Sequence, residues 1–499
     1  MPSVPKLLPR VCVALGFPTT GELSRTAERE YKDGATLLEF RLDYLKNPST
    51  GVDLIRRFRQ ANPDAQILAT CRHRRAHGQF GGSIEDQIRL LKASADAGAA
   101  FLDCEIETAE KAKTMMRDLR EQVPLIVSYH NFESTPALDS VLRRLVSVPA
   151  DIYKIATTAR KPSDNLRLMQ LLRNADGHPM IVVAMSEIGA PSRILSPSLG
   201  SLFTYAAPND QEGTAPGQLA ARTLRTLYRS DKLSKQSRVY GIIADPVFHS
   251  KSPYIHNRAF QSRRLDAVYV PFLVKQNQLA DWMKFACDLP VAGFSVTIPH
   301  KRRILRHLDQ IEPLARRIGA VNTVWRKAGK WRGTNTDADG VLKPLGRHLR
   351  LANASVLIAG YGGAARAAAV ALHDARATVA ITGRNLSSAQ SLARVIKGEA
   401  LTLRQAQQRK FDVLIHATPV GMVPKVDDSL FNDSVPASIV LDMVYNPHET
   451  LLLKRARAEG CTIIPGAEML LEQAVSQFEI WTGESAPREA MRHALEAHL

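Results

Sequence analysis

A lysine and a histidine in neighbouring apolar segments are suited to covalent chemistry on a ketone. Lys154 lies in YKIAT, and His130 follows PLIVSY. A lysine inside a dry segment loses solvation, which favours the neutral amine that attacks a carbonyl to form a Schiff base. His130 can then move protons beside the imine. The alternative is structural: Lys154 extends to solvent or forms an ion pair with Glu105 of FLDCEIE.

Three arginines at similar places could bind an anionic substrate. Arg41 closes TLLEFR, Arg72 follows QILATC, and Arg193 follows MIVVAMSEIGAPS. A guanidinium group binds a carboxylate through two parallel hydrogen bonds. Glu39 lies two residues before Arg41 on the same side of its strand, where it could orient that arginine or bind a hydroxyl.

A second set of reactive side chains follows residue 240. Lys301 ends FSVTIPHK, and Asp337 lies in the loop-rich segment GTNTDADG. A lysine beside an aspartate can relay a proton to or from a hydroxyl as hydride leaves its carbon. HSKSP places Ser250 and Ser252 two residues apart, where they could share one face of an extended loop and bind one carboxylate.

The segment IAGYGGAA at 358–365 follows an apolar strand and opens an alanine-rich helix. Gly360 allows the tight turn, Gly362 lets a pyrophosphate approach, and the helix N-terminus stabilises its charge. The next strand, ATVAITGRN, ends in Arg384 rather than in the acidic residue that binds the ribose of NAD. The sequence therefore favours NADP, although Arg384 could also be an exposed loop cation.

These residues must be positioned by parallel strands. Strands alternating with helix-length segments predict βα units, and eight such units close a TIM barrel whose site lies at the carboxyl ends of the strands. The eight predicted strands are near residues 10–16, 35–41, 66–71, 100–106, 123–129, 151–156, 179–185 and 201–206.

The sequence after the barrel predicts an α/β second half with two parts. Three further strand-and-helix units lead to the TNTDADG loop, and a Rossmann domain and a final helical tail follow. The predicted division is a barrel at 1–228, a linker at 229–237, a substrate domain at 238–340, a Rossmann domain at 341–465, and C-terminal helices at 466–499 that pack back on the substrate domain.

Composition excludes several classes of protein. The net charge is +17, but the basic residues are dispersed and aromatic residues make up only 6%. Anionic small molecules explain this charge better than nucleic acid does. No apolar run is long enough to span a membrane. Five scattered cysteines without CxxC spacing predict a reducing, cytoplasmic location with no disulfide or metal site.

Several motifs of the first half occur together and in order. EFRLD, SYHNFE, YKIAT, PSRI and TAPGQ, within residues 10–222, resemble the type I 3-dehydroquinate dehydratases. The resemblance implies that Lys154 is the Schiff-base lysine and His130 the proton-transfer residue. It also implies a set of substrate-binding residues: Glu39, Arg41, Arg72, Arg193, Thr214 and Gln218.

One departure from that family concerns the loop after the third strand. Members carry a glutamate just before a glycine there, whereas this chain reads RAHGQFGGS with Gly81 at the expected position. The change is expected to weaken hydroxyl contacts or the orientation of His130.

The second half resembles the shikimate dehydrogenases over residues 238–499. HSKSP, FSVTIPHK, IGAVNTV, GTNTDADG, GYGGAAR, HATPVGM, VYNP and GAEMLLEQA occur in the family's order. The resemblance implies that Lys301 and Asp337 are the catalytic pair. It implies substrate binding by Ser250, Ser252, Thr297, Asn322, Tyr445 and Gln473, and cofactor binding by Gly360, Gly362, Gly363, Ala364, Arg384 and Thr418.

Two smaller departures occur in this half. Ser295 stands where many bacterial members have asparagine, and GRNLSSA lacks a second phosphate-binding cation after Arg384. The second departure predicts a partial preference for NADP over NAD.

Together, the two halves resemble the bifunctional dehydratase–dehydrogenases of plants and some bacteria. The resemblance implies dehydration of 3-dehydroquinate to 3-dehydroshikimate and NADPH-dependent reduction to shikimate, by a monomer or homodimer without metal. Four alternatives are a fusion to a quinate/shikimate dehydrogenase that uses NAD, an impaired barrel, a non-catalytic scaffold and a nucleic-acid binder. The intact serine pair of HSKSP favours shikimate over quinate, and the four reactive residues argue against a scaffold.

Overall fold

The computed structural model describes residue 5, residues 8–175 and residues 177–499. The chain forms two compact units. One comprises the residues up to Arg238 together with Asp266–Pro290, and the other comprises Val239–Leu265 and Val291–Leu499.

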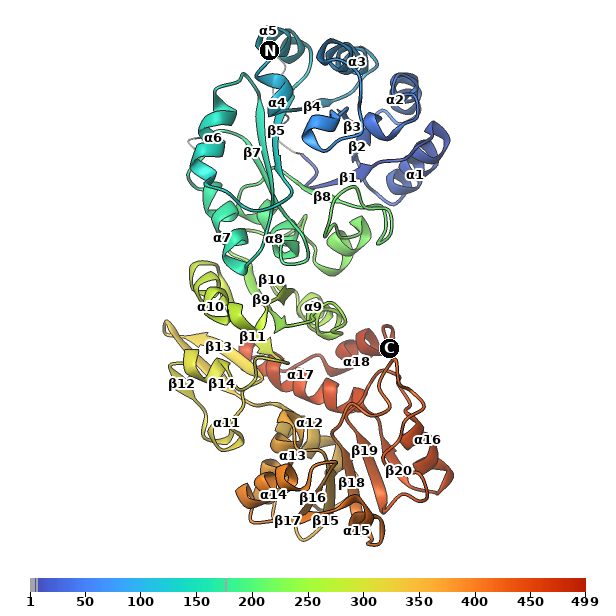
Figure 1. The fold of residues 1–499 in the computed structure, drawn as a ribbon, viewed down its shortest axis with the longest axis vertical. Helices are drawn as coiled ribbons and strands as arrows, with labels where there is room; N and C mark the ends of the chain where they lie inside the picture. The colour runs from blue at the N-terminus through green and yellow to red at the C-terminus, as the bar shows by residue number, and fades with distance from the viewer. Residues whose placement is uncertain (1–4, 6–7, 176) are drawn as a thin grey trace. The chain divides into compact units, whose positions relative to one another are not determined.

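Eight parallel strands of the first unit form a nearly closed barrel (Figure 1), which confirms the predicted fold. They hydrogen-bond in the order β7-β6-β5-β4-β3-β2-β1-β8. Near the join between β7 and β8, the Leu202 N–H donates to the Met180 carbonyl at 2.9 Å. The strands are β1 Val11–Leu15, β2 Leu37–Arg41, β3 Gln66–Thr70, β4 Phe101–Glu105, β5 Leu125–Asn131, β6 Ile152–Thr158, β7 Met180–Met185 and β8 Thr204–Ala206.

Helices connect successive strands and cover the outside of the barrel (Figure 1). Their starts are encoded locally: Thr19 caps the first helix, and Ser83 and Asp86 form a reciprocal capping box at the third. The helices are α1 Thr20–Lys32, α2 Thr50–Ala61, α3 Ile84–Asp96, α4 Ile106–Ala109, α5 Lys113–Gln122, α6 Leu138–Val146, α7 Pro162–Leu171 and α8 Ala190–Leu199.

The alternation of side chains along each strand positions the polar residues of the barrel. An apolar cluster inside it contains Leu37, Phe101 and Ile152. Because side chains two residues apart point to the same face, Glu39 and Arg41, Asp103 and Glu105, and Lys154 also point inward. The polar side chains therefore lie above an apolar floor, toward the carboxyl ends of the strands.

A six-stranded mixed sheet follows, in the order β10-β9-β11-β13-β14-β12. The prediction of three strand-and-helix units was wrong in part, because β13 and β14 form an antiparallel hairpin. Its turn is made by Ala328 and Gly329, both with positive φ. The strands are β9 Arg238–Ala244, β10 Ala267–Leu273, β11 Val291–Val296, β12 Gln310–Ile311, β13 Thr323–Lys327 and β14 Lys330–Thr334, with helices α9 Ser252–Ser262, α10 Leu279–Asp288 and α11 Pro313–Ile318.

A second six-stranded sheet is entirely parallel, in the order β17-β16-β15-β18-β19-β20. In chain order this is the 3-2-1-4-5-6 arrangement of dinucleotide-binding folds, with its switch point between β15 and β18. The strands are β15 Ser355–Ala359, β16 Thr378–Thr382, β17 Glu399–Leu401, β18 Phe411–His416, β19 Ala437–Asp442 and β20 Thr462–Ile464.

Helices cover both faces of the parallel sheet (Figure 1), and a separate apolar core lies on each face. The predicted C-terminal helical tail corresponds to the last two helices of the chain, and the final one packs against α9 rather than against this sheet. The helices are α12 Asp337–Leu345, α13 Gly363–Asp374, α14 Leu386–Val395, α15 Leu403–Gln407, α16 Leu451–Ala458, α17 Gly466–Thr482 and α18 Arg488–Glu496.

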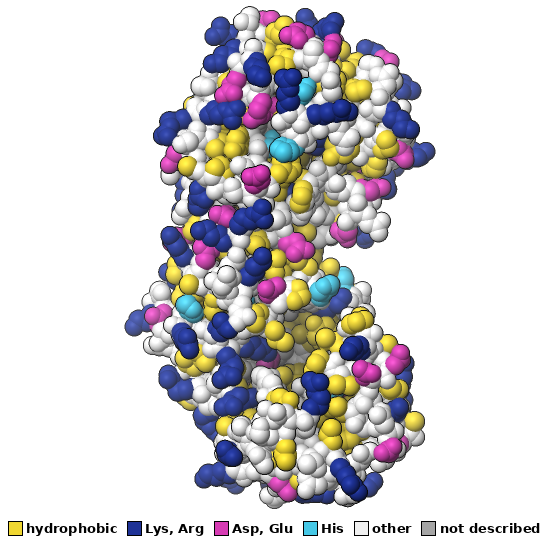
Figure 2. All heavy atoms as spheres, in the orientation of Figure 1, with side chains coloured by type: hydrophobic (Ala, Val, Ile, Leu, Met, Phe, Trp, Pro, Cys, Tyr) yellow, Lys and Arg dark blue, Asp and Glu magenta, His cyan; other side chains and the backbone are white. Residues whose placement is uncertain are grey.

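Lysine and arginine side chains are scattered over the visible face of each unit, between acidic, apolar and neutral groups (Figure 2). Within the described part of the chain, no helix is long and apolar enough to cross a membrane.

Candidate active sites

The first pocket lies inside the barrel, and all eight residues predicted for this half line it. They come from the strands or from the segments that follow them, as the alternation of side chains requires. The cavity is small, with a volume of about 40 Å³. The predicted residues are Glu39, Arg41, Arg72, His130, Lys154, Arg193, Thr214 and Gln218.

Lys154 is buried on β6 and forms an ion pair inside the barrel. Its Nζ donates to Asp103 Oδ2 at 2.9 Å, and Ser128 Oγ donates to Asp103 Oδ1 at 2.6 Å. The Tyr205 ring lies 4.0 Å from the same Nζ. Burial by itself raises the pKa of Asp103, but the charges of Lys154 and Arg72 help to lower it overall. The ammonium group is thus held by one carboxylate and one aromatic face.

The alternative pairing of Lys154 with Glu105 is wrong. Glu105 Oε1 accepts hydrogen bonds from Gln87 Nε2 at 2.9 Å and from Thr108 Oγ1 at 2.7 Å. Its carboxylate therefore fastens α3 and α4 to the end of β4.

His130, on β5, is placed to act as a base. Desolvation, and then the charges of Arg72, Lys154, Arg41 and His77, lower the pKa of His130 well below its usual value of 6.5. Its Nδ1 is inaccessible to solvent and has no hydrogen-bond partner among the described residues. At neutral pH the ring is therefore uncharged and able to take a proton.

Arg193 and Arg72 supply positive charge to the pocket. Arg193, in α8, donates to the carbonyl oxygens of Tyr205 at 3.3 Å and Pro216 at 3.1 Å. Desolvation lowers its pKa to about 9, which leaves the group cationic at neutral pH. No ion pair joins either arginine to a carboxylate among the described residues, so both can receive an anionic substrate.

Arg41 is oriented by a residue that the sequence reasoning did not consider. Its Nε and Nη2 donate to the two carboxylate oxygens of Asp43 at 2.9 and 2.8 Å. Asp43 Oδ2 also accepts the Gln79 N–H at 3.1 Å. Glu39 accepts a 2.7 Å hydrogen bond from Thr70, so Asp43 rather than Glu39 orients Arg41, and the alternative role of Glu39 in binding a hydroxyl stays a prediction. The sequence signal was present in EFRLD, where an aspartate follows the arginine by two residues.

Gly81 does not lie among the residues that line the barrel pocket. A Cβ at this position would instead meet the guanidinium of Arg74. His77 lies closer to the chemistry, because its ring packs 4.8 Å from Phe132, whose ring in turn stacks 6.3 Å from His130. The expectation that Gly81 affects His130 directly therefore has no geometric support.

The loop at 213–218 closes one side of the barrel pocket. Gln218 Oε1 accepts the N–H groups of Thr214 at 2.6 Å and Ala215 at 3.2 Å. Both predicted residues of the TAPGQ motif thus shape the loop as well as line the pocket.

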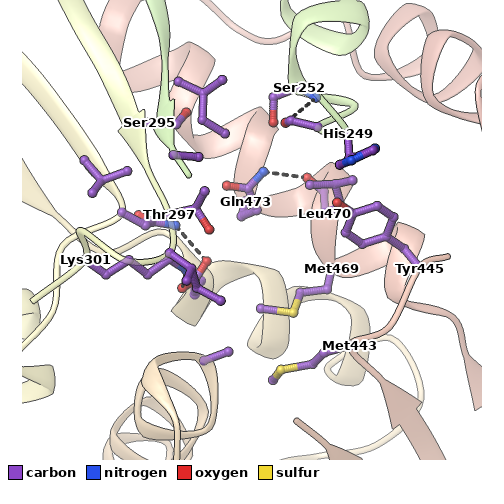
Figure 3. Close-up of a pocket in the computed structure, with 18 of the residues that line it drawn as sticks. His249, Ser252, Ser295, Thr297, Lys301, Met443, Tyr445, Met469, Leu470 and Gln473 are labelled. Atoms are coloured by element: carbon purple, nitrogen blue, oxygen red, sulfur yellow. Dashed lines mark hydrogen bonds and ion pairs between the residues drawn. The ribbon is translucent and has the colours of Figure 1, made fainter. Parts of the chain in front are cut away.

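The second pocket has a volume of about 440 Å³ and lies in the other unit (Figure 3). All of the residues predicted to bind substrate or to catalyse in this half line it. They are Ser250, Ser252, Thr297, Lys301, Asn322, Asp337, Tyr445 and Gln473.

Lys301 and Asp337 form the predicted pair. Lys301 Nζ donates to Asp337 Oδ2 at 2.5 Å, and Asn322 Nδ2 donates to Asp337 Oδ1 at 2.8 Å. Asp337 does not lie in a loop, as predicted, but is the first residue of α12. The asparagine and aspartate residues of TNTDADG favour a helix start, and Asn335 Oδ1 accepts the Asp337 N–H at 3.0 Å.

The serine pair also differs from its predicted setting. Ser252 begins α9 and donates its N–H to Ser250 Oγ at 3.2 Å, so the two residues mark a helix start rather than an extended loop. Pro253 in the first turn is compatible with that start. Gln473 and Tyr445 approach the pocket from other segments (Figure 3). Burial raises the pKa of the Tyr445 phenol, which keeps it protonated as a donor.

Sequence reasoning missed Gln477, which also lines this pocket. Its Oε1 accepts Ser295 Oγ at 2.9 Å, and its Nε2 donates to Thr323 Oγ1 at 3.1 Å. Gln477 lies four residues after Gln473 in α17, and this helical spacing places both amides on one face. That spacing was the available signal.

The glycine-rich loop between β15 and α13 fits a dinucleotide. Gly360 has a φ of 131°, and a Cβ there would lie 2.6 Å from the Ala417 carbonyl oxygen. A Cβ on Gly362 would meet nothing within 4 Å, so this side of the loop is open to a ligand. Gly363 begins α13 and Ala364 lines the pocket, next to the helix N-terminus.

Arg384 is exposed after β16, where a cofactor's 2′-phosphate would be bound. The preceding Gly383 lies under the ring of Tyr361, which would be 2.8 Å from an added Cβ. Thr418 follows β18, and its methyl group lies 3.3 Å from the position of a Cβ on Gly360. No group of three metal-ligating side chains occurs in the described ranges.

Four family models match the chain. Residues 11–235 match type I 3-dehydroquinase, and residues 242–324 match the shikimate dehydrogenase substrate binding domain. Residues 345–428 match shikimate/quinate 5-dehydrogenase, and residues 466–496 match the shikimate 5′-dehydrogenase C-terminal domain.

Two relatives cover most of the chain. It is 34% identical to the chloroplastic bifunctional 3-dehydroquinate dehydratase/shikimate dehydrogenase of Arabidopsis thaliana, over 96% of this chain and 83% of that protein. It is also 34% identical to the shikimate biosynthesis protein AroDE of Chlamydia pneumoniae, over 79% and 81%. A crystal structure of a shikimate dehydrogenase with NADP+ matches with 36% identity and a TM-score of 0.51, over 53% of this chain and 96% of that one.

Proposed function

This chain belongs to the family of bifunctional 3-dehydroquinate dehydratase/shikimate dehydrogenases, and we propose that it catalyses two consecutive reactions. The first dehydrates 3-dehydroquinate to 3-dehydroshikimate, and the second reduces that ketone to shikimate with NADPH. The observation that carries the proposal is that each unit gathers its predicted reactive residues around one pocket, Lys154 with His130 and Lys301 with Asp337.

In the barrel, Lys154 gives its ammonium proton to its partner Asp103, the neutral amine attacks the substrate ketone, and loss of water gives an imine. The imine accepts the electron pair left when a proton is removed from the neighbouring carbon. Uncharged His130 takes that proton and returns it to the departing hydroxyl, which leaves as water. Hydrolysis of the imine then releases 3-dehydroshikimate and restores Lys154.

Positive charge in the barrel binds the substrate carboxylate and neighbouring oxygens. Arg193 and Arg72 are buried cations without carboxylate partners in the described chain, and we assign them to this role. Arg41 also contributes to substrate binding, from a position that is fixed by its two hydrogen bonds to Asp43.

In the second pocket, Lys301 gives a proton to the carbonyl oxygen as that oxygen becomes an alcohol. Asp337 keeps the lysine Nζ in place and is itself oriented by Asn322. Ser250 and Ser252 bind the substrate carboxylate, and the remaining hydroxyl groups are bound by Thr297, Gln473 and Tyr445. Each serine hydroxyl can donate one hydrogen bond, so the pair can bind the two oxygens of a single carboxylate.

NADPH, when bound, supplies the hydride. Gly360, Gly362, Gly363 and Ala364 would hold its pyrophosphate at the start of α13, and Arg384 would hold its 2′-phosphate. Thr418 would lie at the side of this cradle.

We also propose the division into segments 1–228, 229–237, 238–340, 341–465 and 466–499; the order of the four family matches supports the order of these segments. The five free cysteines fit a reducing compartment such as the cytoplasm. The protein acts as a monomer or homodimer on small molecules.

The test is NADPH absorbance after addition of 3-dehydroquinate or 3-dehydroshikimate to the purified full chain. We expect NADPH oxidation with both compounds. Lys154→Ala should abolish the response to 3-dehydroquinate alone, and Lys301→Ala should abolish both. Formation of 3-dehydroshikimate by Lys301→Ala, followed by its ultraviolet absorbance, controls for an intact barrel.

Each failure has its own meaning. Turnover of 3-dehydroshikimate alone would show that the barrel is impaired. Turnover of neither, with oxidation of quinate by NAD+, would replace the shikimate assignment with the quinate alternative.

A further inference from the structure

Three polar side chains at the ends of β18 and β19 form one hydrogen-bond chain. His416 Nδ1 lies 2.8 Å from Asp442 Oδ1, and His416 Nε2 lies 2.6 Å from Thr418 Oγ1. The side chains of His416 and Asp442 are 2% and 0% exposed. A buried chain of this kind fixes the direction of each hydroxyl and ring proton in it.

The other contacts of Asp442 establish that it accepts from His416. Asp442 Oδ2 accepts the Thr450 hydroxyl at 2.6 Å, and Oδ1 accepts the Val444 N–H at 3.0 Å. A carboxylate surrounded by donors orients the imidazole with its proton on Nδ1, as in hydroxyl–imidazole–carboxylate triads. We therefore assign a proton to His416 Nδ1, which donates to Asp442 Oδ1.

The assignment fixes the hydroxyl of Thr418. With its proton on Nδ1, the ring of His416 presents Nε2 as an acceptor, so the Thr418 hydroxyl donates to it. Thr418 Oγ1 in turn accepts the Val420 N–H at 3.2 Å. The threonine hydroxyl has no second proton, so any further group that it binds must donate to its remaining lone pair.

The same chain connects the two loops that complete the pocket. Thr418 begins the segment that carries Met422, and Asp442 begins the segment that carries Met443 and Tyr445. The pocket is lined by Met422, Met443 and Tyr445. The two segments are also joined by a hydrogen bond from the Met443 N–H to the His416 carbonyl at 2.9 Å. The Thr418 methyl group points toward the turn at Gly360, where an added Cβ would lie 3.3 Å from it.

We propose that His416 is a positioning residue of the dehydrogenase unit, which with Asp442 holds the Thr418 hydroxyl as a hydrogen-bond acceptor beside the cofactor cradle. The inference rests on the proposed function, because it assigns the cradle to NADPH. It restricts the group that Thr418 can bind: an N–H or O–H donor of the cofactor, not a phosphate oxygen.

The test compares Thr418→Val, which removes the hydroxyl but keeps the shape, with Thr418→Ser, which keeps the hydroxyl. The dissociation constant of NADPH is measured by its fluorescence on binding to the full chain without substrate. Because one hydrogen bond is lost, we expect the NADPH dissociation constant of Thr418→Val to be about tenfold higher than that of wild type. The NADPH dissociation constant of Thr418→Ser should stay within about twofold of the wild-type value, because this variant keeps the hydroxyl.

His416→Asn tests the positioning step. Alone it should weaken NADPH binding about as much as Thr418→Val does, and the double variant should be no weaker than either single variant, since both act through one hydroxyl. The KM for 3-dehydroshikimate should stay unchanged, and the thermal unfolding of each variant, followed by circular dichroism, reports whether the dehydrogenase unit is folded.

Three results would overturn the inference: equal NADPH binding by Thr418→Val and wild type, equal loss in the valine and serine variants, or additive losses in the double variant. If His416→Asn fails to fold, the comparison of valine with serine still decides whether the hydroxyl is used. Failure of the wild-type chain to bind NADPH would instead contradict the proposed function.

Discussion

Lys154 and Asp103 form an ion pair inside the barrel, with 2.9 Å between Nζ and Oδ2 and side chains that are 5% and 1% exposed. Removing either charge would leave the other buried without a partner, which strongly destabilises a folded protein. The nucleophile of the proposed dehydratase is therefore also part of the barrel's structure.

Replacement of Lys154 should cost stability as well as activity. We expect Lys154→Met to abolish dehydration and to lower the free energy of unfolding of the barrel by about 3–5 kcal/mol, because Asp103 loses its partner. The double variant Lys154→Met/Asp103→Asn should regain most of that stability while remaining inactive. Urea unfolding followed by circular dichroism measures the free energy of unfolding of both variants. Equal destabilisation of the single and double variants would show that Asp103 does not depend on Lys154 for its stability in the barrel.

His130 should be an uncharged base throughout the neutral pH range. Its pKa is lowered in the folded state, so above pH 6.5 it is neutral whether the chain is folded or not. Below pH 6.5 only the unfolded chain takes up the proton, so stability falls as the pH falls from there toward the lowered folded pKa. We expect His130→Gln to lose less stability between pH 6.5 and pH 5 than wild type does.

The same variant separates proton transfer from imine formation. His130→Gln should lower the dehydratase kcat by about 10²–10⁴-fold, which is the usual contribution of a general base. Borohydride should still fix substrate to Lys154, as detected by mass spectrometry of the intact chain. A His130→Gln variant with wild-type kcat would remove the residue from the mechanism.

Two glycines of the cofactor loop should respond differently to alanine. Gly360→Ala places a Cβ 2.6 Å from the Ala417 carbonyl at a φ of 131°, so we expect a lower melting temperature and lost NADPH binding. Gly362→Ala adds a methyl group to open space, so we expect an unchanged melting temperature but lost NADPH binding. Tight NADPH binding by Gly362→Ala would show that the pyrophosphate does not approach this side of the loop.

Arg384 should set the preference between cofactors. We expect Arg384→Ala to weaken NADPH binding by about tenfold and to leave NADH binding unchanged, because a guanidinium–phosphate contact is lost. Arg394→Ala, which removes another exposed arginine ten residues later, is the matched control. Fluorescence titration measures both constants, and equal loss of the two cofactors would assign Arg384 to the adenosine or pyrophosphate instead.

Much of the fold could be predicted because it depends on local patterns. Apolar segments at regular spacing located the barrel strands, and the twofold alternation along each strand placed Glu39, Arg41 and Lys154 inside. The glycine loop and its helix were equally local. The hairpin of β13 and β14 was missed because its turn, Ala328–Gly329, lies in a short polar segment with a weak signal.

The sequence by itself determined which side chains face each pocket, since strand alternation and helical spacing are properties of the chain. Only the tertiary structure decided how they pair. Asp103 and Glu105 both point into the barrel from β4, and alternation cannot choose between them as partners of Lys154. The choice was made by Gln87 and Thr108, which bind the Glu105 carboxylate from α3 and the end of α4 and leave Asp103 to the lysine. A hydrogen bond depends on distance and direction between segments far apart in the sequence, and only folding fixes these.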